Sequence, residues 1–294
     1  MDVRRSENTI IGSSVTAWRP DIPAITEVFH ATYRRHAYPV HTHTEWTLLI
    51  IDDGVLHFDV GRQHHGTVRS QVVLLPPHVP HDGRTAAPQG FRKRVVYLAE
   101  EVLDTDLIGR AADRPNLADP RLWDRIDRLH DALAHPADAL EGESRLALIV
   151  ERLDHQLRRD IGRRRPCTTD PGLADRLRAL LDEHVSDGMP LDQAARLLQS
   201  TPNQLVRTFA RRFSIPPHLY LTGRRVELAR RLLLSGQPAS AVAVAVGFYD
   251  QSHLTRHFKR MLGVGPGYYA RLSRGVDHAR NVQDGGFGAR DHPG

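Results

Sequence analysis

The sequence predicts an α+β multidomain protein, with a small β-barrel and a helical hairpin in its amino-terminal part and an all-α domain of two helix-turn-helix units in its carboxy-terminal part. Three observations lead to this prediction. Short β-rich runs fill the chain from about 26 to 99, two amphipathic helical patterns follow between 121 and 159, and one helical pattern occurs twice after residue 190. At 294 residues the chain is about twice as long as a typical domain, which fits more than one core.

The predicted barrel is built from the runs "WTLLII", "VLHFDV", "QVVLL" and "KRVVYL", which are rich in β-branched and aromatic residues. The turn-forming stretches "DDG", "GRQ" and "LPPHVPHDG" lie between them. Several short strands with regular turn signals and no intervening helix are typical of a sandwich or a small barrel. We assign this domain to residues 1–110.

The predicted hairpin follows at residues 111–162, where "RLWDRIDRLHDAL" and "SRLALIVERLDHQL" carry apolar residues at helical spacing. Two roles are open for its apolar stripes, and both can hold: packing over the barrel, and pairing two subunits into a homodimer. The dimer contact is expected at Leu122, Ile126, Leu129, Leu133, Leu146 and Leu153.

Beyond the hairpin, a polar, basic and proline-interrupted segment indicates a domain linker at 163–171. The second domain then occupies residues 172–274. The glycine-rich end, 275–294, is expected to be disordered.

The second domain contains an internal repeat with an offset of 49 residues. Each copy has a short helix of small and apolar residues, a tight turn and a second helix. Thr201 and Asp250 are the expected N-caps of the two second helices, and Pro202 follows Thr201 at the first helical position. One long helix, from about 217 to 235, is expected to connect the two units. The register holds without a gap through the pairs Ala194 and Ala243, Leu205 and Leu254, Arg207 and Arg256, Phe209 and Phe258, Arg211 and Arg260, Pro217 and Pro266, and Tyr220 and Tyr269.

The second helix of each unit has an apolar face and a polar, basic face. Arginine can read guanine, asparagine and glutamine can read adenine, and the outer cations can hold phosphates. The alternative is an ordinary solvated helix face, but two copies in register favour DNA reading. The expected DNA contacts are Asn203, Gln204, Arg207 and Arg211 in the first copy and Gln251, Ser252, His253, Arg256, Lys259 and Arg260 in the second.

Charge supports double-stranded DNA as the partner. Residues 163–274 hold 18 basic and 8 acidic side chains, a balance of +10, whereas residues 101–162 hold 9 and 14, a balance of −5. The single cysteine, Cys167, cannot form an internal disulfide, and no apolar run approaches the length of a membrane span. We therefore expect a soluble cytoplasmic protein with no membrane segment.

The stretch "RRVELARRLLLSGQPASAVAVAVGFYDQSHLTRHFKRMLGVGPGYY" strongly resembles the AraC/XylS signature, and the resemblance covers about 172–272. It implies a DNA-binding regulator. Its base-contacting positions would be Asn203, Arg207, Gln251, Ser252, His253 and Arg256. One departure is Ser214, where many members of the family have glycine, as at the counterpart Gly263. The first reading helix is therefore expected to end less sharply.

The segments "HTHTEW" and "PPHVPH" resemble the two cupin motifs, and the barrel looks like the effector-binding domain of many AraC-family regulators. By this resemblance His41, His43, Glu45 and His81 would form an effector pocket or hold a divalent metal such as zinc, iron or nickel. Glu45 lies closer to His43 than the motif prescribes, and His78 stands where the second motif usually has glycine. Pocket lining and metal binding both remain open.

These features together predict a sequence-specific transcription regulator, expected to be an activator. A small molecule bound in the barrel would control it, the hairpin would pair subunits, and RNA polymerase would be a further partner. Two alternatives are a cupin metalloenzyme with an accessory DNA-binding domain and an architectural protein that bends DNA without sequence preference. The spacing of Glu45 argues against the first, and the lack of an apolar wedge in the reading helices argues against the second.

Overall fold

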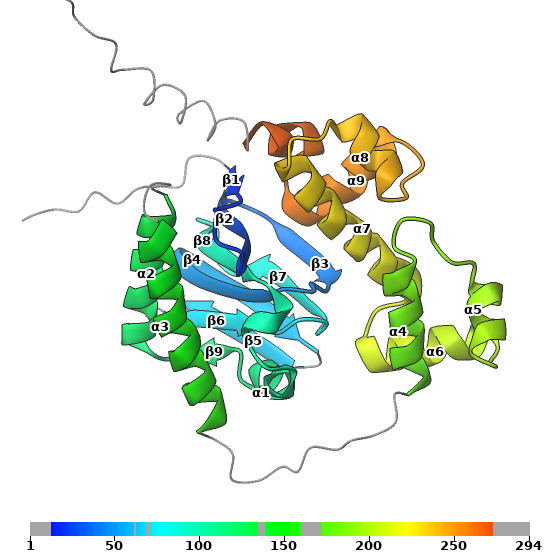
Figure 1. Ribbon diagram of the computed structural model, residues 1–294, viewed down its shortest axis with the longest axis horizontal. Helices are drawn as coiled ribbons and strands as arrows, with labels where there is room; N and C mark the ends of the chain where they lie inside the picture. Colours follow the sequence, from blue (N-terminus) through cyan, green and yellow to red (C-terminus); the bar gives the residue numbers. More distant parts are fainter. Residues whose placement is uncertain (1–12, 62, 69–70, 135–138, 160–171, 273–294) are drawn as a thin grey trace, which may run out of the picture.

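The computed structural model describes residues 13–61, 63–68, 71–134, 139–159 and 172–272. The expected linker at 163–171 and the expected disordered end at 275–294 lie outside these residues. Figure 1 shows a β-sheet domain, a helical hairpin along one side of it, and a helical region along the other. This arrangement confirms the α+β fold class.

The amino-terminal domain is an open barrel rather than a closed one. Its main sheet has the strand order β1-β2-β8-β4-β6-β9, while β3 pairs with β7, and β5 and β7 both pair with β4. The strand pairs whose register the structure gives are all antiparallel. The strands are β1 (Ser14–Trp18), β2 (Ile25–Tyr33), β3 (Ala37–His41), β4 (Trp46–Val60), β5 (Gln63–Val68), β6 (Val72–Leu75), β7 (His81–Thr85), β8 (Phe91–Leu98) and β9 (Asn116–Leu117).

The long strand β4 shows why its first half is almost entirely apolar. Side chains alternate between the two faces of a strand. Trp46, Leu48 and Ile50 therefore join one core, and Leu49 and Ile51 join another. Both faces are covered, so the first half of β4 has no polar face at all.

The hairpin helices α2 (Pro120–Leu133) and α3 (Ala139–Arg158) cover the first of these cores. Asp119 caps α2 by accepting from two backbone N–H groups, and Pro120 starts the helix. Two 3-10 turns and one short helix precede the hairpin: Glu100–Val102, Thr105–Leu107 and α1 (Ile108–Asp113).

The six side chains expected at a dimer contact are all buried inside the protomer. They pack with the sheet in one core, which corrects the expectation that they face a second subunit. Each helix buries a single stripe, and the barrel is large enough to cover both stripes. The six residues are Leu122, Ile126, Leu129, Leu133, Leu146 and Leu153.

The carboxy-terminal domain has the two predicted helix-turn-helix units and the long helix between them. Thr201 and Asp250 cap the reading helices as expected, each accepting from a backbone N–H in the first turn. The helices are α4 (Leu173–Glu183), α5 (Leu191–Leu197), α6 (Pro202–Phe213), α7 (Pro217–Leu234), α8 (Ala239–Ala245) and α9 (Gln251–Leu262).

Ser214 ends α6 as sharply as Gly263 ends α9. Both residues take the left-handed conformation, with φ of 58° and 74°, and both donate their backbone N–H to the carbonyl four residues earlier. The expectation of a less sharp end at Ser214 is therefore wrong. Serine tolerates this conformation at a cost that glycine does not carry.

The two helix-turn-helix units differ in their cores. The first unit has a core of its own, formed by α4, α5, α6 and the start of α7. The second unit shares a core with the inner face of the barrel, where Val226 and Phe258 belong to the same cluster as Phe29 and Val95. The second unit thus shares its apolar core with the barrel, whereas among the described residues the first unit's apolar core is separate.

Candidate functional site

The two reading helices, α6 and α9, present the predicted polar faces to solvent. Their predicted inward side chains are buried, including Leu205, Phe209, Leu254 and Phe258. Nine of the ten predicted DNA contacts are exposed, and the tenth, His253, is half-buried. The nine exposed residues are Asn203, Gln204, Arg207, Arg211, Gln251, Ser252, Arg256, Lys259 and Arg260. The ring of His253 packs between Phe248 and His257, with centroids 5.1 and 4.9 Å away.

Several cations on these faces are available to a polyanion. Arg212, on the side of α6, pairs with Asp175 at 3.9 Å. In the part of the chain that the structure describes, Arg207, Arg256 and Lys259 have no such carboxylate partner. Helix α7 joins the two units over 18 residues, a length of about 27 Å at 1.5 Å per residue.

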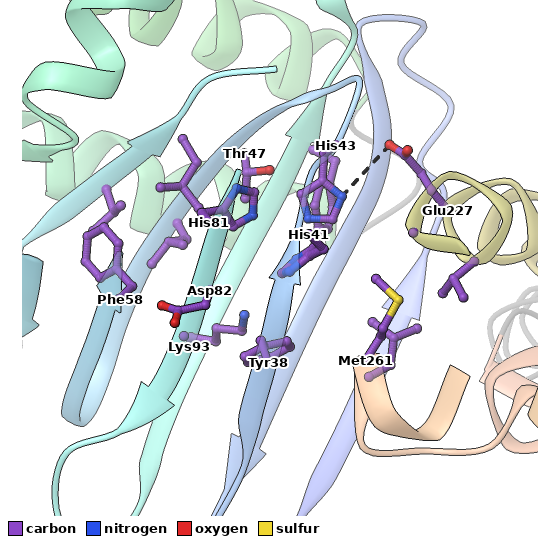
Figure 2. Close-up of a pocket in the computed structure, with 18 of the residues that line it drawn as sticks. Tyr38, His41, His43, Thr47, Phe58, His81, Asp82, Lys93, Glu227 and Met261 are labelled. Carbon is purple, nitrogen blue, oxygen red and sulfur yellow. Dashed lines mark ion pairs between the residues drawn. The ribbon is translucent and has the colours of Figure 1, made fainter. Parts of the chain in front are cut away.

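A cavity of about 40 Å³ lies where the barrel meets the carboxy-terminal domain. Its walls come from the barrel strands, and its lid comes from Gly223, Val226, Glu227 and Arg230 on α7 and from the end of α9. Figure 2 shows Glu227 and Met261 approaching the strands from the helical side. A cavity of this size holds roughly three water molecules. A larger ligand therefore requires the lid and the walls to move apart.

Three of the four predicted pocket residues, His41, His43 and His81, come together in this cavity. His41 ends β3 and pairs across the sheet with His81, the first residue of β7. The ring centroids of the three histidines are 4.5 to 5.1 Å apart, and one ring nitrogen from each lies within 4.8 Å of the others. Burial lowers the pKa of all three, that of His81 to about 4, so the rings are neutral near pH 7.

Two of these rings are held by backbone carbonyls. Nδ1 of His41 lies 2.7 Å from the carbonyl oxygen of Pro39, and Nδ1 of His81 lies 3.0 Å from that of Val79. A carbonyl can only accept, so Nδ1 carries the proton in both rings, and Nε2 keeps a free lone pair. Nδ1 of His43 is buried without a hydrogen-bond partner.

Glu45 does not join the three histidines as one set. Its carboxylate instead forms a second group with His43 and Glu227, a residue of α7 that the sequence analysis did not select. Burial and the neighbouring Glu227 charge raise the pKa of Glu45. Burial also works to raise the pKa of Glu227, but the hydrogen bond from Glu45 and the charge of Arg224 outweigh it and lower that pKa. Protonation of Glu45 is therefore favoured over protonation of Glu227.

One sequence signal could have pointed to Glu227. It is the only acidic residue between Asp192 and Asp250, within a strongly basic domain. Its carboxylate accepts the backbone N–H of Thr44 at 2.9 Å and pairs with Arg224. The signal marks the residue as unusual, but it does not reveal that the partner is in the barrel.

His78 has a separate role. It takes φ of 62°, the left-handed region that favours glycine, and this explains why the cupin motif usually has glycine there. Its ring lies 3.2 Å from the carboxylate of Glu100, away from the three pocket histidines.

Lys93, one of the two lysines of the chain, also lines the cavity and was missed. Its ammonium lies 4.2 Å from the centre of the Tyr38 ring, and burial followed by the charge of Arg230 lowers its pKa to about 7. Among the described residues it has no carboxylate at ion-pair distance. A buried cation without a counter-charge suits an anionic ligand.

Beside the cavity, a buried cluster of Glu27, Arg230 and Tyr269 joins the two domains. Arg230 of α7 donates to Glu27 of β2 at 2.6 Å, and the Tyr269 hydroxyl donates to the same carboxylate. The Arg230 guanidinium lies 4.4 Å from the centre of the Tyr97 ring. A further contact runs from the Tyr33 hydroxyl to the carbonyl of Leu262 at 2.7 Å.

Two protein families match the chain: the AraC-like ligand binding domain matches residues 24–150, and a helix-turn-helix domain matches residues 194–272. The chain belongs to the AraC family of transcriptional regulators. This confirms the resemblance seen in the sequence. The named relatives are transcription regulators, so the comparisons do not support the metalloenzyme alternative.

Individual relatives match over about a third of the chain. The probable transcriptional regulator LumQ of Photobacterium leiognathi is 28% identical over 90 residues, which cover 30% of this chain and 36% of LumQ. The virulence regulon transcriptional activator VirF of Yersinia enterocolitica is 29% identical over 101 residues, 34% of this chain and 37% of VirF. The matched region therefore spans only about a third of these curated relatives.

Among solved structures, ToxT of Vibrio cholerae has the same two-domain fold. It superposes with a TM-score of 0.58 over 90% of this AraC-family chain and 99% of ToxT, at 11% sequence identity. ToxT bound to an unsaturated fatty acid matches with a TM-score of 0.58 over 90% of this chain and 97% of ToxT, at 14% identity. At this identity the match shows the fold alone.

Proposed function

We propose that the protein is a sequence-specific transcription regulator that binds double-stranded DNA and is controlled by a small molecule in the interdomain cavity. The single observation that carries the proposal is that one helix, α7, both spaces the two exposed reading helices and forms the lid of the cavity. A ligand that moves α7 away from the barrel therefore acts on the DNA-reading unit directly.

The roles of the reading residues follow from their chemistry. Asn203, Arg207, Gln251 and Arg256 are suited to base edges, because amide and guanidinium groups can form bidentate contacts there. Lys259 and the outer arginines are suited to phosphates, which position the protein without reading sequence. The length of α7 and its flanking turns approaches the roughly 34 Å between successive faces of the major groove.

For the effector we propose an anionic molecule with an apolar body. Among the described residues, the buried amine of Lys93 has no carboxylate at ion-pair distance, and apolar side chains such as Leu49, Phe58 and Val73 line the remaining wall. ToxT, which shares the fold, binds an unsaturated fatty acid and a butenoic acid, both carboxylic acids. The cavity is too small for such a molecule while it is closed, so binding would couple to opening of the domain contact.

We further propose that the protein is a cytoplasmic activator that works as a homodimer and contacts RNA polymerase. None of the described helices is long and apolar enough to cross a membrane. Because the apolar stripe of the hairpin is buried, a dimer contact through α3 would use its outer face, where Leu140 and Leu148 are 75% and 50% exposed. The exposed Val244 and Tyr249 on the second unit offer an apolar surface for polymerase.

Selection of binding sites from a random double-stranded DNA library, followed by titration with the selected site, tests the proposal. Arg207→Ala and Arg256→Ala should each weaken specific binding by about 1–3 kcal/mol and relax the preference at a few base pairs. Lys259→Ala should weaken all sequences alike and reduce the salt dependence. Arg212→Ala, on the same helix as Arg207 but paired with Asp175, is the matched control. Failure to enrich any sequence, or unchanged specific binding in both arginine variants, would contradict the proposal.

A further inference from the structure

The cupin resemblance implies a divalent transition-metal ion on His41, His43 and His81, and we propose that Glu227 of the DNA-reading domain makes such an ion sensitive to the contact between the two domains. This inference goes beyond the regulator function, because it concerns a metal site shared across the domain boundary. It does not depend on DNA binding.

The three histidines have the geometry of a ligand set. They are 4 to 7% exposed, they come from two paired strands and the segment after one of them, and one nitrogen of each lies within 4.8 Å of the others. Three imidazoles can occupy three of the four ligand positions around a tetrahedrally coordinated ion and leave the fourth position open.

The surroundings of the rings add a second, independent argument. Metal-binding histidines almost always donate their other ring N–H to a carbonyl or carboxylate, which fixes the lone pair toward the ion. His41 and His81 already do this through Pro39 and Val79. The remaining ring, His43, has no partner of this kind within hydrogen-bonding distance.

Glu227 offers the hydrogen-bond acceptor that Nδ1 of His43 lacks. Its carboxylate lies 3.9 Å from Nδ1 of His43, and Figure 2 shows the other ring nitrogen on the side of His41 and His81. A metal ion on that second nitrogen holds the proton on Nδ1, where it faces Glu227. A movement of less than 1 Å would close this gap to a hydrogen bond. The carboxylate–histidine–metal arrangement would then run from the barrel to helix α7.

The site also has room and chemistry for the open fourth position. A cavity of about 40 Å³ admits an ion with a water molecule, and Lys93 lines the same cavity. An anionic ligand at the fourth position would be held by the ion and by Lys93 together. Imidazole ligands suit zinc, nickel, copper and iron, and we choose zinc and cobalt as probes because zinc is redox-inert and cobalt reports its coordination by its visible spectrum.

The experiment uses the full-length chain without a histidine tag, stripped with a chelator and titrated with Zn²⁺ against a chromophoric competitor. We expect one Zn²⁺ ion to bind tightly per chain. Co²⁺ bound in its place should give a visible spectrum typical of nitrogen ligands. His81→Ala and His43→Ala should abolish the tight equivalent, and circular dichroism should show that both variants remain folded. His64→Ala, which removes a 56%-exposed histidine of the β5 strand, should change nothing and controls for adventitious binding.

Glu227→Gln tests the link to the DNA-reading domain, because it keeps the shape of the side chain but removes its charge. We expect the zinc affinity to fall about 10- to 100-fold, as for other partners of metal-bound histidines. Zinc should also slow hydrogen exchange in α7 of the unmodified protein, and this protection should be lost in the variant. Zinc bound only through surface histidines would overturn the metal site, and an unchanged affinity in Glu227→Gln would overturn the coupling. Neither result bears on the DNA selection experiment, so the two proposals fail separately.

Discussion

At the scale of single residues, the most informative side chains are buried polar groups whose partners come from distant parts of the chain. His30 and His130 are an example outside the cavity. Nε2 of His30 lies 3.1 Å from Nδ1 of His130, which joins strand β2 to hairpin helix α2. Burial, followed by the charge of Arg94, lowers the pKa of His30 to about 4. Burial, followed by His30, lowers the pKa of His130 well below its usual value.

This pair predicts a loss of stability in mild acid. The unfolded chain binds protons below pH 6.5 while the folded rings stay neutral, so their contribution is complete above pH 6.5 and is lost as the pH falls toward 4. The fall of the His30 pKa from its ordinary value of 6.5 to about 4 corresponds to about 3 kcal/mol. Urea unfolding at pH 7.5, 6 and 5 should show a shallower pH dependence for the His30→Gln and His130→Gln double variant. His64→Gln should keep the slope of the unmodified protein, and equal slopes for all three proteins would contradict the prediction.

At the scale of elements, the hairpin shows that an amphipathic pattern does not identify its partner. The stripes of α2 and α3 have the spacing that a dimer contact needs, but the sheet of the same protomer covers them. The amphipathic pattern indicates only that one face of each helix is buried. Burial against another part of the same chain requires no second molecule.

The hairpin residues should therefore contribute to folding stability rather than to association. Leu129→Ala, at a fully buried site, should destabilise the protein by about 2–5 kcal/mol, because it removes packed methyl groups and leaves a cavity. Leu148→Ala, at a half-exposed site on the outer face of α3, should cost less than about 0.5 kcal/mol. Chemical denaturation measures both changes in stability.

Sedimentation of Leu148→Ala at micromolar concentration tests the outer face of α3 as a dimer contact. If Leu129→Ala instead kept its stability but became monomeric, the apolar stripe of the hairpin would have to lie at a subunit interface.

At the scale of the whole molecule, the domain contact is the feature through which the cavity can act on DNA binding. The second helix-turn-helix unit shares a core with the barrel, while the first unit has its own. Ion pairs and hydrogen bonds of Glu227, Arg230, Tyr33 and Tyr269 lie around that shared core. Movement of the second unit relative to the barrel would reorient both reading helices relative to the barrel together, because α7 connects them.

Removing the charge of Glu27 should open this contact. Arg230 is 4% exposed, and a buried charge that loses its partner costs about 3–5 kcal/mol. Glu27→Gln should therefore speed hydrogen exchange in α7, α9 and β3 and increase the radius of gyration in small-angle scattering, while both domains stay folded. Glu100→Gln, which breaks a pair with His78 inside the barrel at a partly exposed site, is the control and should leave the domain contact unchanged. Unaltered exchange and scattering in Glu27→Gln would show that the Glu27–Arg230 ion pair does not hold the domains together.

The sequence by itself determined the local structure and the chemistry of the DNA-reading surface. Caps at Thr201 and Asp250, the inward side chains Phe209 and Phe258, and the outward Arg207 and Arg256 follow from helical spacing and from a repeat of 49 residues. The same is true of the strands and of the grouping of His41 with His43. These features depend on residues close together in the chain, where backbone geometry translates spacing into direction.

Only the tertiary structure decided which surfaces meet. It placed Glu227 beside His43 from 184 positions away, separated Glu45 from His41 and His81, covered the hairpin stripe with the sheet, and left the barrel open. The physical reason is that apolar burial is not directional: a stripe of leucines or a lone buried acid gains as much from one matching surface as from another. The choice between surfaces depends on the shape of the assembled chain, which no local pattern contains.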